Sequence, residues 1–64
     1  MWAELMKVPN RMTAEMWKDF LEGEGLPAQV WPEPFEAGPT ALVHYRVMVA
    51  KAKVHVAWEA IRKL

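Results

Sequence analysis

Residues 41–49 have the sequence ALVHYRVMV, in which the side chains alternate in character along the chain. Val43, Tyr45, Val47 and Val49 occupy odd-numbered positions, which share one side of an extended chain. The opposite side holds His44, Arg46 and Met48. Because the side chains of a β-strand point alternately to its two faces, this pattern predicts a strand whose valine-rich face packs against a core.

Two elements are predicted at the beginning of the chain. Residues 2–8 lean towards apolar side chains and predict a first strand. Apolar side chains then recur at intervals of three and four, as on a helix: Met12, Met16, Trp17, Phe20 and Leu21. Asn10 or Thr13 can cap the beginning of this helix, and the glycines and proline of residues 23–27 end it.

The segments on either side of the long strand have different patterns. Residues 28–31 alternate and predict a short strand, whereas the prolines and glycine of residues 32–40 predict a loop. Residues 51–64 predict a closing helix with one apolar stripe: Val54, Ala57, Trp58, Ile61 and Leu64. We expect the apolar stripes of both helices to pack in the core, against the valine face of the long strand.

Together these elements predict a single α+β domain, residues 1–64, of β-α-β-β-α order. This is a ferredoxin-like sandwich that lacks the fourth strand. A right-handed crossover places the third strand between the first two, so we expect the sheet order 1-3-2 with both helices on one face. The edge of the first strand is then uncovered, which makes residues 2–8 the expected place of a dimer contact. Within that strand Trp2, Met6 and Val8 oppose Ala3 and Leu5, and either set can face the core.

Composition narrows the function classes. The chain has no cysteine and two histidines, so we expect neither a disulfide, nor a metal site, nor a cofactor. It also has no serine and no convergent acid–base pair, which argues against an enzyme. The formal net charge of zero argues against nucleic-acid binding. Neither a signal peptide nor an apolar run near the roughly 20 residues of a membrane span is present, so a cytoplasmic location is expected.

The charges are unevenly distributed along the chain. Residues 1–40 hold three basic and seven acidic side chains, whereas residues 41–64 hold five basic and one acidic. The two halves can complement each other within one subunit or between two subunits. Alternatively, three bases near the start of the last helix, where free backbone N–H groups also point outward, can bind an anion: Arg46, Lys51 and Lys53.

A second candidate surface is the face of the sheet that the helices leave uncovered. The side chains expected there or along the first strand are Trp2, Glu4, Met6, Gln29, Trp31, His44, Arg46 and Met48. Aromatic, methionine and arginine side chains are enriched in protein interfaces, although a simply solvated face is the alternative. Four tryptophans exceed what so small a core can enclose, so at least one should be exposed.

Several segments resemble a family of prokaryotic signal-transducing proteins, which is a domain of unknown function. Residues 8–10, 13–16 and 20–28, the last of sequence FLEGEGLPA, are similar to its first strand, helix and turn, and residues 47–49 and 57–64 are similar to its closing strand and helix. The resemblance implies a compact, PII-like ferredoxin-like fold and no established activity. Where family members have proline and acidic residues, this chain has Ala50-Lys51-Ala52-Lys53, so the contacts of those acidic residues are not carried over.

The sequence therefore predicts a non-enzymatic binding module of signal-transducing type. We expect a homodimer that forms through the first-strand edge or the open sheet face. The alternative is a sensor of a small molecule or of an anion such as phosphate or a nucleotide, bound at the basic start of the last helix.

Overall fold

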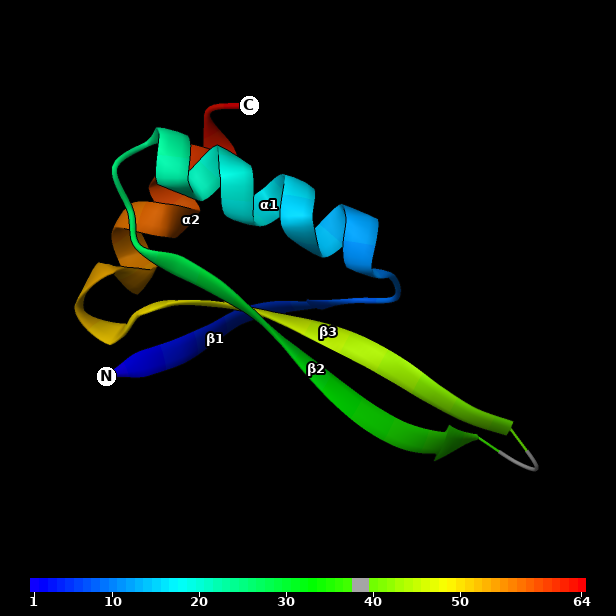
Figure 1. The fold of residues 1–64 in the computed structure, drawn as a ribbon. Helices are drawn as coiled ribbons and strands as arrows, with labels where there is room; N and C mark the ends of the chain where they lie inside the picture. The colour runs from blue at the N-terminus through cyan, green and yellow to red at the C-terminus, as the bar shows by residue number, and fades with distance from the viewer. Residues whose placement is uncertain (38–39) are drawn as a thin grey trace.

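The computed structural model describes residues 1–37 and 40–64. Its elements are β1 (Trp2–Val8), α1 (Arg11–Gly23), β2 (Ala28–Ala37), β3 (Thr40–Ala50), the short 3₁₀ helix η1 (Lys51–Lys53) and α2 (Val54–Arg62). The three strands are antiparallel in the order β1-β3-β2, and both helices lie on one face of the sheet (Figure 1). The predicted α+β fold, with its ferredoxin-like β-α-β-β-α order and its sheet order, is confirmed.

Local hydrogen bonds fix both ends of α1. The Thr13 backbone N–H donates to the Asn10 side chain at 2.8 Å, so Asn10 is the residue that caps the helix. At the other end Gly25 has a φ of 81°, and the Leu26 N–H donates to the Leu21 carbonyl at 3.0 Å. This left-handed turn reverses the chain and starts β2 towards the sheet.

β2 and β3 form a hairpin that is longer than the sequence predicts. The loop predicted at residues 32–40 is wrong for residues 32–37 and 40, which belong to the two strands, and residues 38–39 lie outside the described residues. Pro32 and Pro34 are compatible with β2 because it is an edge strand, on which a missing N–H can face away from the neighbouring strand. The C-terminal part of β2 and the N-terminal part of β3 project beyond the helices (Figure 1).

The core lies between the helices and the near half of the sheet. Val47 and Val49 of β3 are completely buried, as are Leu21 of α1 and Ala57 of α2. The predicted core face of the long strand is therefore confirmed at these two valines. Val43, which stands opposite Pro34 of β2, is 38% exposed.

A β-bulge in β1 decides which of its side chains face the core. The register with β3 shifts between Glu4 and Met6, so Leu5 is an extra residue in the ladder. Leu5 and Val8 are buried, and Met6 packs against the same core. A bulge interrupts the two-residue alternation of a strand. The core therefore receives Leu5 from one of the two candidate faces of this strand, and Met6 and Val8 from the other.

The apolar stripes of the helices are only partly buried. Met12 and Met16 are 77% and 64% exposed, and Trp58 is 43% exposed, so the predicted packing of these three side chains in the core is wrong. In α1 the fully buried positions are Ala14 and Leu21, which are seven residues apart and share the side towards the sheet. The exposure of Trp58 confirms that the core does not enclose all four tryptophans.

The closing helix begins later than predicted. Lys51–Lys53 form η1, and the α-helix begins at Val54 with no side-chain hydrogen bond at its cap. Two lysines at this position oppose the helix dipole, which disfavours an earlier start. The Lys51 N–H instead donates to the Met1 carbonyl at 2.8 Å and ties η1 to the beginning of β1.

Candidate functional site

The sheet face opposite the helices, here called the open face, carries mainly polar and aromatic side chains. The strand register sets them in rows across the sheet: Glu4, Met48 and Gln29; Lys7, Arg46 and Trp31; and His44 with Glu33. Side chains from all three strands therefore meet on this face.

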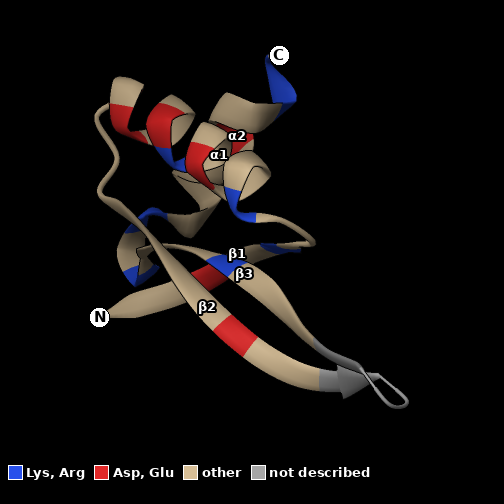
Figure 2. Ribbon diagram, turned by 45° about the vertical axis from the view of Figure 1, so that its right-hand side comes forward, with Lys and Arg blue, Asp and Glu red and all other residues tan. Residues whose placement is uncertain are grey.

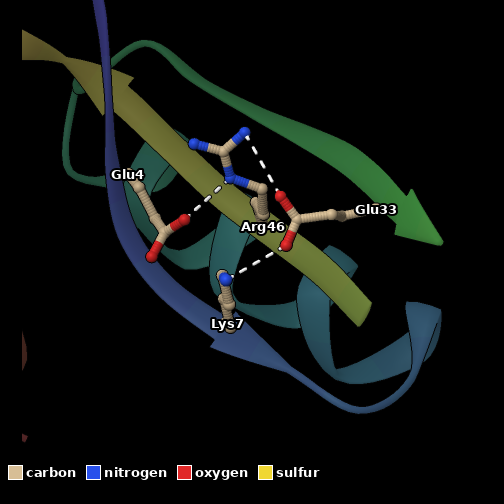
Figure 3. Close-up of polar contacts among 4 residues, drawn as sticks. All are labelled: Glu4, Lys7, Glu33 and Arg46. Atoms are coloured by element: carbon tan, nitrogen blue, oxygen red, sulfur yellow. Dashed lines mark hydrogen bonds and ion pairs between the residues drawn. The ribbon is translucent and has the colours of Figure 1, made fainter. Parts of the chain in front are cut away.

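Arg46 is the centre of an ion-pair network on the open face (Figure 3). Its Nε donates to Glu4 Oε1 at 2.7 Å, and its Nη1 lies 3.8 Å from Glu33 Oε2. Lys7 Nζ lies 3.0 Å from Glu33 Oε1. The network therefore links β1, β2 and β3, and it neutralises most of the charge on the face. Because its members are partly exposed, each pair contributes roughly 0–1 kcal/mol to stability.

Aromatic side chains lie beside this network. The Arg46 guanidinium carbon is 5.6 Å from the centroid of the Trp31 ring, within cation–π range. The Trp31 indole N–H donates to the Gln29 side-chain oxygen at 2.8 Å. Further along the hairpin, the Phe35 and His44 rings stack with centroids 3.9 Å apart. These contacts fix the orientation of flat side chains on the open face.

The Glu33 carboxyl is held in its charged form. A hydrogen bond from Lys7 lowers the pKa of Glu33 below its ordinary value of 4.5, and the charges of Lys7, Arg46 and His44 act in the same direction against desolvation. A carboxyl whose pKa is lower in the folded state stabilises the fold above its unfolded pKa. That contribution is lost as the pH falls through the lowered folded pKa, so the network is intact at neutral pH.

The structure brings together most of the predicted interface residues. Glu4, Gln29, Trp31, His44 and Arg46 all lie on the open face. Two other candidates differ. Met48 lies there but is 2% exposed, so the single chain already covers it, and Met6 packs on the helix side because of the bulge. Trp2, the eighth candidate, is half-buried at the start of β1.

The predicted anion ligands are not brought together. Arg46 is engaged by the carboxylates of Glu4 and Glu33. Lys51 and Lys53 lie in η1, beyond the end of β3 at Ala50. An extended strand rises about 3.3 Å per residue, which puts Arg46 on the order of 13 Å from that end. The grouping expected for an anion site is therefore missing.

The two edges of the sheet differ in what they offer to a further strand. β2 carries Pro32 and Pro34, which have no N–H to donate along that edge. β1 forms the other edge and contains no proline. Proline on an edge strand is a common means of preventing edge-to-edge pairing, so only the β2 edge has this protection.

The register shows which backbone groups of β1 face outward. In an antiparallel ladder, residues alternate between those bonded to the neighbouring strand and those whose N–H and C=O point away. The Lys51 N–H donates to the Met1 carbonyl, so the backbone carbonyl of Met1 points towards β3. By alternation, the next residue, Trp2 opposite Ala50, points away from β3, and so does Glu4 opposite Met48. We infer that the backbone N–H and C=O of Trp2 and Glu4 point away from the sheet along the free edge.

Sequence reasoning missed an apolar groove on the other side of the molecule, here called the helix-layer groove. It is lined by Met16, Trp17 and Phe20 of α1 and by Leu64, and its volume is about 210 Å³. The Trp17 and Phe20 rings meet edge to face with centroids 6.1 Å apart, while Met16 and Leu64 are 64% and 75% exposed. The sequence did contain a signal for this groove. The apolar stripe of α1 is wider than the side of the helix that a sheet can cover, so part of the stripe must be exposed.

A second hollow lies between the N-terminal part of α1 and the hairpin. Its lining residues are Arg11, Glu15, Val30, Pro32 and Tyr45, and its volume is about 230 Å³. Pockets for small organic ligands usually measure roughly 300–1,000 Å³. Arg11 and Glu15 also form an ion pair with each other at 3.8 Å, so the two charged side chains that line this hollow are already paired.

Within residues 1–37 and 40–64, no helix has the length and apolar character needed to cross a bilayer. Comparison of the chain with protein-family models, curated proteins and solved structures finds no match in any of the three. The resemblance to signal-transducing proteins thus stays a prediction, and the functional inference depends on the surfaces described above.

Proposed function

We propose that this chain is a non-catalytic interaction module that forms a homodimer through the free edge of β1. The two subunits pair their first strands antiparallel about a two-fold axis, which joins two three-stranded sheets into one of six strands. On the resemblance to signal-transducing proteins, the dimer serves in cytoplasmic signalling. Partner recognition then belongs to the open face, where the Arg46 network and Trp31 are held in fixed positions.

The observation that carries this proposal is the difference between the two sheet edges. Prolines remove hydrogen-bond donors from the edge of β2. β1 contains no proline, and the backbone groups of its Trp2 and Glu4 point outward. Two-fold pairing makes every edge hydrogen bond twice. Since each such bond is worth roughly 0.5–1.5 kcal/mol net, a few of them together with side-chain burial around Trp2 support association at micromolar concentration.

The alternative function, an anion sensor, has weaker support. It required Arg46, Lys51 and Lys53 to converge, and Arg46 is paired with Glu4 and Glu33. Binding an anion at Arg46 would break those pairs. The homodimer requires no such rearrangement.

Replacement of Glu4 by proline is expected to weaken dimerisation by about tenfold or more, since it removes an outward N–H from both subunits. Glu4→Ala is the matched control, because it loses the same side-chain contact with Arg46 but keeps the N–H. Sedimentation equilibrium of both variants gives the dissociation constants, and near-ultraviolet circular dichroism of the tryptophans checks that each is folded. Equal dissociation constants for the two folded variants would exclude pairing through this edge.

A further inference from the structure

We infer that the helix-layer groove binds the same groove of a second copy of this chain. This inference goes beyond the proposed function because it uses the helix layer rather than the β1 edge or the open face. A chain with both surfaces active assembles into four copies, as two β1-edge dimers that meet through their helices.

The groove is apolar and open. Met16 and Leu64 stand at its margins with most of their surface in solvent, and Trp17 and Phe20 form its floor. Met12, one helical turn before Met16, is 77% exposed and extends the apolar strip along α1. Contiguous exposed apolar side chains of this kind mark contact sites in soluble proteins.

The charges beside the groove identify the occupant as a second copy. Asp19, which is exposed, follows Met16 by one turn on α1, and Lys63, which is also exposed, directly precedes Leu64, so an acidic and a basic side chain each neighbour a lining residue of the groove. Figure 2 shows acidic bands along α1 and a basic segment at the C-terminal end. A two-fold axis that runs along the groove sets the acidic side of each copy against the basic side of the other.

Among the side chains that the structure describes, in residues 1–35 and 42–64, neither Asp19 nor Lys63 takes part in an ion pair. Of the bases in the second half of the chain, Arg46 alone pairs with acids of the first half in that described part. The complementarity of the two halves is therefore mostly unused within one copy and is available between copies.

Sedimentation equilibrium of the full chain, whose mass is 7.4 kDa, tests the inference. The wild type is expected to reach four times this mass, and Met16→Gln to stop at twice this mass. Two Met16 side chains are buried in each groove-to-groove contact, so their loss weakens that contact by about tenfold or more. Leu42→Gln is the control, because Leu42 is an exposed apolar residue of the hairpin and lies outside the groove.

The charges give an independent readout. Asp19→Lys or Lys63→Asp alone is expected to weaken the groove contact by roughly fivefold at low salt, and the double variant to restore it. Additive weakening in the double variant would overturn the inference, as would a mass unchanged by Met16→Gln. If Glu4→Pro alone forms a two-copy species, and the added Met16→Gln dissociates that species, the groove contact is supported independently of the β1 edge. A Glu4→Pro protein of 7.4 kDa at every concentration overturns the groove and leaves the β1 edge standing.

Discussion

Leu21→Ala is expected to lower the free energy of unfolding by about 3 kcal/mol, which is within the usual range for removing a buried leucine. Leu21 is completely buried on the sheet side of α1 and belongs to the same core as Val47 and Val49. A chain of 64 residues has a total stability of roughly 3–10 kcal/mol, so this one change removes a large part of it. Urea unfolding followed by tryptophan fluorescence measures the difference.

Met16→Ala on the same helix is the matched control. Met16 is 64% exposed, so its truncation leaves no internal cavity, and we expect a change below about 1 kcal/mol. Both variants are compared at the same low concentration, because association adds to the apparent stability. Equal losses at the two positions would contradict the assignment of Leu21 to the core and Met16 to the surface.

Gly25→Ala is expected to destabilise the fold by about 1–2 kcal/mol, the usual penalty for a side chain in the left-handed region. Gly25 has a φ of 81°, and its N–H donates to the Glu22 carbonyl at 2.9 Å as part of the turn that ends α1. Apart from its two chain neighbours, no residue has a described atom within 4 Å of the added methyl group, so the expected loss comes from the backbone conformation. The turn also brings Leu26 into the core beside Leu21.

The neighbouring glycine gives the opposite expectation. Gly23 is the last residue of α1 and has no positive φ, and a methyl group there also meets open space. Gly23→Ala should therefore stabilise the fold by about 0.4–1 kcal/mol, because alanine restricts the unfolded chain. Thermal unfolding of the pair tests both signs in one experiment. A neutral or stabilising Gly25→Ala would show that glycine is not required at this turn, and a destabilising Gly23→Ala would contradict the expectation for Gly23.

The fold was predictable from the sequence because local patterns and topology agree. The alternation of residues 41–49 identified the central strand, and the handedness of the crossover then determined the sheet order. The extent of β2 was not predictable from local signals. Prolines suggest a loop unless the strand is already known to be an edge, and edge position is a property of the whole sheet.

The candidate surfaces were only partly predictable. Alternation placed Trp31, His44 and Arg46 on the open face, but the bulge at Leu5 moved Met6 to the other side, and nothing in residues 2–8 signals a bulge. The pairing of Arg46 with Glu4 joins residues 42 positions apart, which requires the register of β1 against β3. The groove was missed because periodicity identifies apolar stripes without showing how much of each stripe the sheet covers.

Amide hydrogen exchange at Glu4 tests the β1-edge dimer most directly, because it reports on a backbone group that faces the free edge. If two copies pair there, exchange of the Glu4 N–H slows as the protein concentration rises through the micromolar range. The Ala3 N–H, which faces β3, stays protected throughout and serves as the internal reference. Fast exchange of the Glu4 amide at every concentration, beside a protected Ala3, would contradict the dimer proposed for this chain.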